Sequence, residues 1–91
     1  MTETVARRIV VRGRVQGVFF RDATRRAALS RGVAGWVRNR PDGTVQAHLE
    51  GSDDDVDTMV RWCREGPRHA DVDAVGVEEV EPEGLAGFAI R

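Results

Sequence analysis

Apolar residues alternate with polar ones near the start of the chain, which is the spacing of a β-strand. Every second position from Ile9 to Val15 is apolar or glycine, whereas most positions between them are arginine. Because successive side chains of a strand point to opposite faces, this period of two predicts a strand over residues 7–15. Residues 1–5 lack the pattern, and we expect them to form a loose terminus.

A helical spacing follows, in which apolar or small residues recur every three or four positions. The segment contains good helix formers and neither glycine nor proline. Gly32 then suits the left-handed position that commonly ends a helix. The pattern predicts a helix over residues 20–31. Its expected buried stripe consists of Phe20, Ala23, Thr24, Ala27 and Ala28.

Two further strands are predicted over residues 34–40 and 44–50, on either side of a strong turn signal. That signal is the Pro-Asp-Gly sequence of residues 41–43, in which proline presets one backbone angle and glycine accepts a left-handed one. Two extended runs joined so closely form a β-hairpin.

An acidic segment opens the second predicted helix. Ser52 and Asp55 have the spacing of a capping box, and the acids suit the positive end of a helix. The Gly-Pro sequence of residues 66–67 ends this helix. Alternation then predicts a strand over residues 73–80 and a short last strand over residues 88–90. The apolar stripe of the second helix comprises Val56, Met59, Val60 and Cys63.

The element order is β-α-β-β-α-β with a short C-terminal strand added. It predicts an α+β fold, the ferredoxin-like split βαβ sandwich, with two helices on one face of a mixed, mostly antiparallel sheet. A right-handed crossover is expected to place the first and third strands as parallel central neighbours. The second strand then lies beside the third, so its end and the loop after the first strand share one region.

Charge is divided unevenly between the two halves of the chain. Residues 1–40 hold ten arginines and two acids, a balance of +8, whereas residues 41–91 hold four arginines and thirteen acids, a balance of −9. A basic first half attracts anionic ligands, either a small phosphate or nucleic acid.

Length and cysteine content bound the setting in which the chain works. Ninety-one residues make one small domain, and the single Cys63 excludes an internal disulfide and fits a reducing compartment. No apolar run is long enough to span a membrane, and no signal segment opens the chain. We therefore expect one cytoplasmic domain over residues 1–91, monomeric and without a membrane partner.

The strand of residues 7–15 leads into a glycine-bounded loop and then into a helix with Arg21 in its first turn. A helix start has unpaired N–H groups and partial positive charge, so it can receive an anion, and Arg21 adds a charged fork suited to phosphate. The loop lacks both the P-loop and the dinucleotide signature, and its glycines also fit a plain turn. The candidate phosphate-binding backbone is that of Val15, Gln16, Gly17, Val18, Phe19 and Phe20.

Asn39, at the end of the second predicted strand, is the second candidate. Its amide has donors and an acceptor, so it can hold a water molecule for in-line attack on phosphorus. Beside a turn, asparagine also has a purely structural use.

The loop sequence GRVQGVFFR, residues 13–21, resembles the signature of the acylphosphatase family. The resemblance continues, in the family's order and over nearly the whole chain, in GWVRN (35–39), PDGT (41–44) and FAIR (88–91). It implies hydrolysis of small-molecule acyl phosphates without a cofactor. By the same resemblance, Arg21 and Asn39 align with the positions that bind phosphate and orient water.

The inventory of residues agrees with such a substrate. No histidine, cysteine or acid cluster has metal-ligand spacing, and no Ser-His or Cys-His pair is evident. An acyl phosphate releases a carboxylate, whose conjugate acid has a pKa of about 4, so the leaving group needs little acid assistance. We therefore expect no metal.

Two other function classes compete with this hypothesis. A non-enzymatic RNA-binding module would need exposed aromatic residues on the central strands, which are absent, so we expect no nucleic acid partner. A domain of a larger maturation enzyme of the hydrogenase carbamoyltransferase type could keep the same phosphate cradle. Its length as a separate chain argues against that role.

The remaining reactive residues have structural interpretations. We expect Cys63 to be a buried thiol, and His48 and His69 to be solvated or packed. Asp22 departs from the acylphosphatase pattern, in which an aromatic residue is common, and we expect it to offset the local positive charge slightly.

Overall fold

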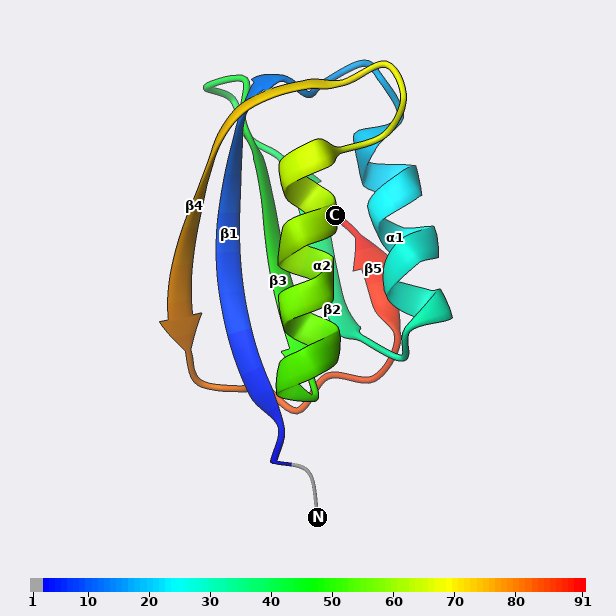
Figure 1. Ribbon diagram of the computed structural model, residues 1–91, viewed down its shortest axis with the longest axis vertical. Helices are drawn as coiled ribbons and strands as arrows, with labels where there is room; N and C mark the ends of the chain where they lie inside the picture. The colour runs from blue at the N-terminus through cyan, green and yellow to red at the C-terminus, as the bar shows by residue number, and fades with distance from the viewer. Residues whose placement is uncertain (1–2) are drawn as a thin grey trace.

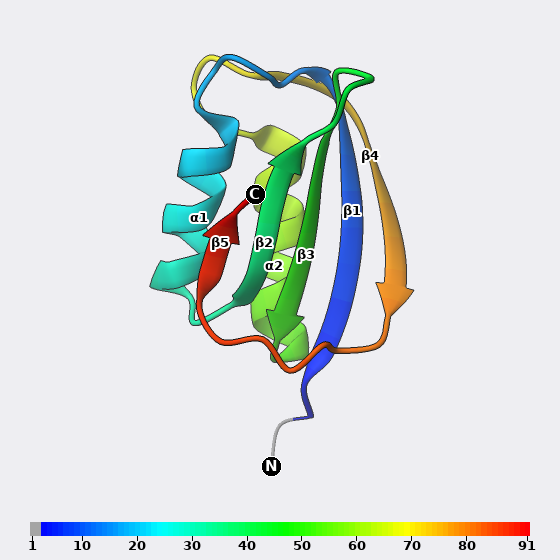
Figure 2. The same ribbon diagram turned by 180° about the vertical axis from the view of Figure 1, so that it is seen from behind.

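A computed structural model describes residues 3–91 and contains two helices and five strands. Both helices cover one face of a single sheet, and neither covers the other face, which we call the open face (Figures 1 and 2). The strand order is β4-β1-β3-β2-β5, which confirms the predicted ferredoxin-like sandwich with an added strand. The elements are β1 (Val5–Arg14), α1 (Phe20–Ser30), β2 (Ala34–Asn39), β3 (Val45–Gly51), α2 (Asp53–Glu65), β4 (Asp71–Val80) and β5 (Phe88–Ile90).

The predicted parallel pairing of the first and third strands is wrong. β1 and β3 are antiparallel neighbours, with Ile9 opposite Ala47. The crossover through α1 makes β1 and β2 run the same way, and the tight hairpin then reverses the chain. β3 enters between β1 and β2 and is antiparallel to both, so the loop after β1 and the end of β2 do lie at the same end of the sheet (Figure 2).

The only parallel pair in the described part of the sheet is that of β5 with β2. Phe88 lies opposite Gly35 and Ile90 opposite Val37, so β5 covers only part of the edge of β2. The side chain of Arg25 on α1 donates to the backbone oxygen of Phe88 at 3.1 Å. β5 is therefore fixed by both the sheet and the helix.

Most element bounds match the prediction within two residues, and the differences have local causes. β1 begins at Val5, earlier than expected, because Val5 and Ala6 pair with the end of β3. Of the terminus predicted to be loose, residues 1–2 lie outside the described residues. Near its other end β1 shifts register at Gly13, where an added Cβ would overlap the backbone oxygen of Asp71. Only glycine permits so close an approach.

The core lies between the helices and the covered face of the sheet. Ile9, Leu49 and Met59 are fully buried there, and the predicted stripes of both helices face them. Cys63 is also buried, as expected, and burial raises the pKa of its thiol to about 12. Such a thiol is inert at neutral pH. Neither helix of residues 3–91 is both long and apolar enough to cross a membrane.

Candidate functional site

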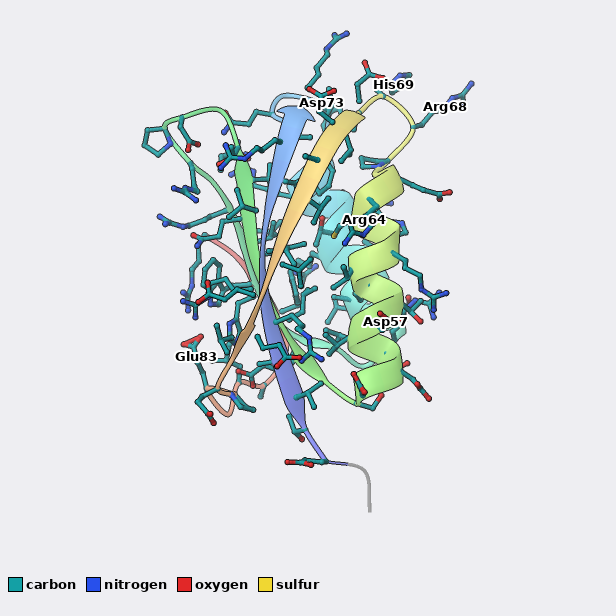
Figure 3. The ribbon with its side chains drawn as sticks, turned by 60° about the vertical axis from the view of Figure 1, so that its left-hand side comes forward. Asp57, Arg64, Arg68, His69, Asp73 and Glu83 are labelled. Carbon is teal, nitrogen blue, oxygen red and sulfur yellow. The ribbon has the colours of Figure 1, made fainter. Side chains whose placement is uncertain are left out.

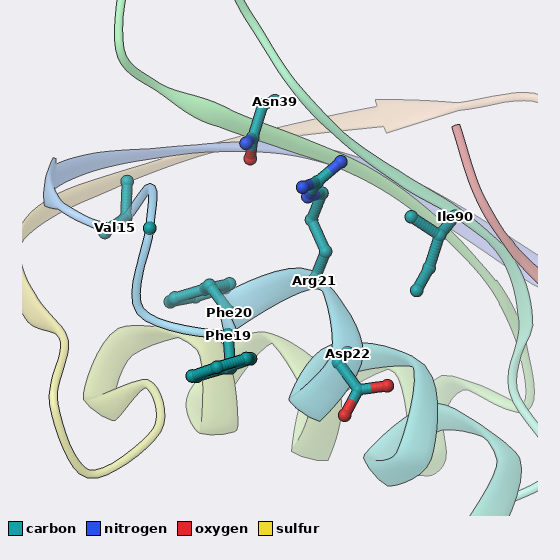
Figure 4. Close-up of a pocket in the computed structure, with 8 residues that line it drawn as sticks. Val15, Phe19, Phe20, Arg21, Asp22, Asn39 and Ile90 are labelled. Carbon is teal, nitrogen blue, oxygen red and sulfur yellow. The ribbon is translucent and has the colours of Figure 1, made fainter.

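The loop between β1 and α1 borders a cavity of about 420 Å³ at one end of the sheet (Figure 4). The two predicted catalytic residues, Arg21 and Asn39, both line it although they come from different elements. The topology achieves this because β2 ends beside the loop that follows β1. The full lining consists of Val15, Gly17, Phe19, Phe20, Arg21, Asp22, Asn39 and Ile90.

The backbone of this loop has an unusual conformation at Phe19. Its φ of 62° and ψ of 26° lie in the left-handed region, and no other non-glycine residue of the described chain has a positive φ. Gly17 also has a positive φ, 75°. A left-handed residue followed by helical ones turns successive N–H groups toward one side, which is the geometry of an anion-binding nest.

Helix α1 begins at this loop without a side-chain cap. Its first hydrogen bond runs from the N–H of Ala23 to the oxygen of Phe19, at 3.0 Å. The N–H groups of Phe20, Arg21 and Asp22 precede that bond, so they have no acceptor within the helix. They add the positive end of the helix dipole to the cavity.

Arg21 extends toward the strand that carries Asn39, whereas Asp22 points away from it (Figure 4). Asp22 instead pairs with Arg26 one turn along the helix, at 2.9 Å. Within residues 3–91, Arg21 forms no ion pair. The guanidinium of Arg21 is therefore available to an anionic ligand, in spite of the acid beside it in the sequence.

Gln16 ties the loop to the hairpin that carries Asn39. Its side-chain Nε2 donates to the backbone oxygens of Arg40 and Thr44, both at 2.8 Å. The hairpin turn itself is closed by Asp42, which accepts from the N–H and the hydroxyl of Thr44 at 3.0 and 2.6 Å. These hydrogen bonds, that of the hydroxyl first, lower the pKa of Asp42. The two halves of the site are thus held together as one unit.

The side chains of the predicted phosphate-binding loop divide into two groups. Val15, Val18 and Phe20 are buried and anchor the loop to the core, whereas Phe19 is 79% exposed. Val18 and Gln16 do not line the cavity, so if they bind phosphate they do so through the backbone alone. Ile90 lines it without having been predicted, since only the pairing of β5 with β2 brings it there.

A second polar cluster lies on the open face of the sheet. Buried His48 contacts the carboxylate of buried Glu50 at 2.6 Å and lies 3.4 Å from Glu83. Glu83 lies on the side of the sheet opposite α2 (Figure 3). Glu50 also accepts from the backbone N–H groups of Glu83, Gly84 and Leu85, which fixes the β4–β5 connection. Burial tends to raise the pKa of Glu50, but these hydrogen bonds outweigh it and lower the pKa overall.

The atoms of this cluster are close enough to hold a metal ion, a grouping that the sequence spacing did not reveal. A guanidinium occupies its remaining side, since Arg8 lies 3.2 Å from Nδ1 of His48 and 3.6 Å from Glu83. The positive charge of Arg8 opposes a cation there. The cluster therefore has a structural role, in which it fixes the β4–β5 connection to the open face of the sheet. This agrees with the packed role expected for His48.

Comparisons with known proteins agree with this geometry. Residues 7–90 match the family model described as Acylphosphatase. The acylphosphatase of Rubrobacter xylanophilus is 59% identical over 92% of this chain and 77% of its own. That of Haloquadratum walsbyi is 51% identical over 100% of this chain and 99% of its own. The structure of an acylphosphatase from Coxiella burnetii superposes with a TM-score of 0.93 at 35% identity, over 97% of this chain and 93% of the other. The chain therefore belongs to the acylphosphatase family.

Proposed function

We propose that this chain hydrolyses acyl phosphates without a metal ion, with the loop backbone and Arg21 binding the phosphoryl group and Asn39 orienting the attacking water. Membership of the acylphosphatase family makes it a hydrolase of acyl phosphates. The observation that carries the residue roles is the shared cavity, in which an unpaired arginine, an uncapped helix start and an amide side chain meet.

Phosphate binding rests on the number of donors available at one place. The loop and helix start supply backbone N–H groups, and Arg21 supplies a charged pair of donors in fixed geometry. In phosphoryl transfer, charge is spread over the three equatorial oxygens, and preorganised donors stabilise it there. Val15, Gln16, Gly17, Val18, Phe19 and Phe20 form the proposed cradle.

The chemical step needs few further groups. A water molecule held by the amide of Asn39 attacks phosphorus, and the bond from phosphorus to the acyl oxygen breaks. The carboxylate leaves with the bonding electron pair, and a phosphate oxygen takes the proton of the water. Because the carboxylate is the conjugate base of an acid with a pKa of about 4, no general acid is required.

Substitution of Arg21 tests the cradle. We expect Arg21→Ala to lower kcat/KM for benzoyl phosphate by about 10³-fold, because a preorganised charged contact to the transition state is lost. Hydrolysis is measured with excess chelator, and binding of inorganic phosphate by calorimetry. Loss of wild-type activity in chelator would contradict the metal-free mechanism, and full activity of Arg21→Ala would contradict the cradle.

Substitution of Asn39 tests the placement of water. Asn39→Ala should lower kcat by about 10²–10³-fold while the dissociation constant for inorganic phosphate changes little. Asn39→Asp is the matched variant, since it keeps the shape and the acceptor but removes the amide donors. An unchanged kcat for Asn39→Ala would remove Asn39 from the mechanism.

We also infer that residues 1–91 act as one domain, monomeric and cytoplasmic, on a small molecule and not on nucleic acid. The lone buried Cys63 supports a reducing compartment. The open-face positions of the central strands that Arg8, Val10, Gln46 and His48 occupy carry no Phe, Tyr or Trp for base stacking. Light scattering of the purified chain tests whether it is a monomer. Retention of single-stranded RNA on a filter tests whether it binds nucleic acid.

A further inference from the structure

A second hollow lies on the open face of the sheet, beside the catalytic cavity. Its volume is about 520 Å³, and three of the residues around it are arginines from three different strands or their ends. Within residues 3–91 no acidic residue lines it, although Glu83 lies 3.6 Å from Arg8 at its border. The lining consists of Arg8, Trp36, Arg38, Asn39, Gln46 and Arg91.

Two arginines of this hollow, Arg38 and Arg91, are held in place by uncharged partners. Arg38 donates from Nε to the side-chain oxygen of Gln46 at 2.8 Å. The guanidinium of Arg91 lies 4.7 Å from the centre of the Trp36 ring, and that of Arg8 lies 5.5 Å from it. Cation–π and amide contacts orient a guanidinium without cancelling its charge. The arrangement is therefore preorganised for an anion.

The positive charge of the hollow is largely unpaired. Among residues 3–91, neither Arg38 nor Arg91 forms an ion pair, and Arg8 has only Glu83, at 3.6 Å. Nε of Arg8 is buried without a hydrogen-bond partner in the described chain. Two free guanidinium groups in one hollow favour a carboxylate or phosphate.

Asn39 joins this hollow to the catalytic cavity, because it lines both. The pairing of β5 with β2 ends at Val37, where Ile90 lies opposite, and the N–H of Arg91 donates to the oxygen of Val37 at 2.9 Å. Beyond that point the edge of β2 is not covered by β5. Asn39 and the uncovered end of the β2 edge therefore lie between the catalytic cavity and the hollow on the open face.

We propose that this hollow is a subsite for the acyl part of the substrate, and that it selects acyl phosphates whose acyl chain carries a second anionic group. The inference rests on the proposed function, since Asn39 and Arg21 define where the phosphoryl group lies. Arg38 and Arg91 bind the distant anion, and Trp36 and Gln46 position them. Either a carboxylate or a phosphate ester meets this chemistry.

The test compares substrates of equal chain length. Valeryl phosphate ends in a methyl group, the monoacyl phosphate of glutaric acid ends in a carboxylate, and a third substrate of the same length ends in a phosphate ester. We expect wild-type kcat/KM to be higher for the two anionic chains than for valeryl phosphate. In the double variant Arg38→Gln/Arg91→Gln, that preference should fall about tenfold, through KM more than kcat. The size of the fall in kcat/KM for the carboxylate-ended and for the phosphate-ended substrate shows which of the two anions the hollow prefers.

Arg64→Gln is the matched control, because Arg64 is an exposed arginine on α2 and lies away from the open face (Figure 3). It should leave the ratio between substrates unchanged, whereas raised salt should reduce the wild-type preference. If valeryl phosphate is hydrolysed but the double variant keeps the wild-type ratio, the subsite is wrong and the proposed function stands. If wild-type protein hydrolyses none of the three, both fall together.

Discussion

The two helices of this chain begin in opposite ways. At α2, Ser52 has an extended backbone and its hydroxyl accepts from the N–H of Asp55 at 3.2 Å. Three acids, Asp53, Asp54 and Asp55, occupy the first turn. At α1, left-handed Phe19 stands in the capping position, and no side chain accepts from the helix start.

The positive N-terminal end of the helix dipole therefore has a different use in each helix. At α2 the hydroxyl of Ser52 satisfies the N–H of Asp55, and the carboxylates of the first turn neutralise the positive end, which stabilises the fold. At α1 the N–H groups and the positive charge stay available, and the one acid of the first turn, Asp22, is paired with Arg26. The proposed anion site therefore lies at the helix start that has no side-chain cap.

This availability has a cost in stability. A bulky residue in the left-handed region is strained by roughly 1 kcal/mol, and a missing cap forgoes about 1 kcal/mol more. The buried side chains of Val18 and Phe20, on either side of Phe19, hold the loop in that conformation. Burial of apolar surface thus offsets the strain that the site requires.

A carboxylate placed at the start of α1 should make that helix start as unfavourable for an anion as the start of α2. Phe19→Asp puts a negative charge at the mouth of the cavity, and aspartate tolerates the left-handed conformation. We expect the dissociation constant for inorganic phosphate to rise at least about tenfold, because like charges repel across a partly shielded site. Calorimetric titration with phosphate measures the change.

Phe19→Asn is the control for that variant, since it has the same shape without the charge. It should change the dissociation constant by less than about threefold, and both variants should unfold in urea at concentrations close to that of the wild type. Equal affinity of Phe19→Asp and Phe19→Asn for phosphate would mean that the N-terminus of α1 does not contact the anion.

Removal of the cap at α2 should lower the stability of the protein and leave its activity unchanged. Ser52→Ala leaves the N–H of Asp55 without its acceptor, and we expect the free energy of unfolding to fall by about 1 kcal/mol. Activity toward benzoyl phosphate should stay at the wild-type level, because Ser52 caps α2 whereas the cradle lies at the start of α1. Urea unfolding followed by circular dichroism measures the loss; Ser52→Asp, which can also cap, should restore stability. A loss of activity in folded Ser52→Ala would contradict the division of roles.

The difference between the capped start of α2 and the uncapped start of α1 could be predicted in part from the sequence. The Ser-Asp spacing at residues 52 and 55 predicted the cap of α2, and the glycines and Arg21 predicted an anion site at α1. Both depend on neighbours within a few positions. The left-handed conformation of Phe19 could not be predicted, because it is imposed by the burial of the residues on either side of it.

Contacts between distant segments were the ones that the sequence did not predict. Gln16 reaches backbone oxygens 24 and 28 residues away, and Glu50 holds the N–H of a residue 33 positions on. Such partners depend on strand order and register, which periodicity alone leaves open. The direction of β3 was predicted wrongly although a hairpin fixes it, because the crossover rule was applied to the wrong pair of strands.

The smallest changes in stability and phosphate affinity are expected when one acid is neutralised in the first turn of α2 or of α1. Asp54→Asn removes an exposed carboxylate from the positive end of α2, and should lower the free energy of unfolding by about 0.5 kcal/mol without changing phosphate affinity. Asp22→Asn removes the corresponding carboxylate from α1 and its ion pair with Arg26. It should cost a similar amount of stability but strengthen phosphate binding about twofold, because Asp22 lines the cavity. Urea unfolding and phosphate titration at low salt give both quantities for each variant. If Asp22→Asn binds phosphate no better than Asp54→Asn does, the charge of Asp22 does not act on the bound phosphate, although Asp22 lines the cavity.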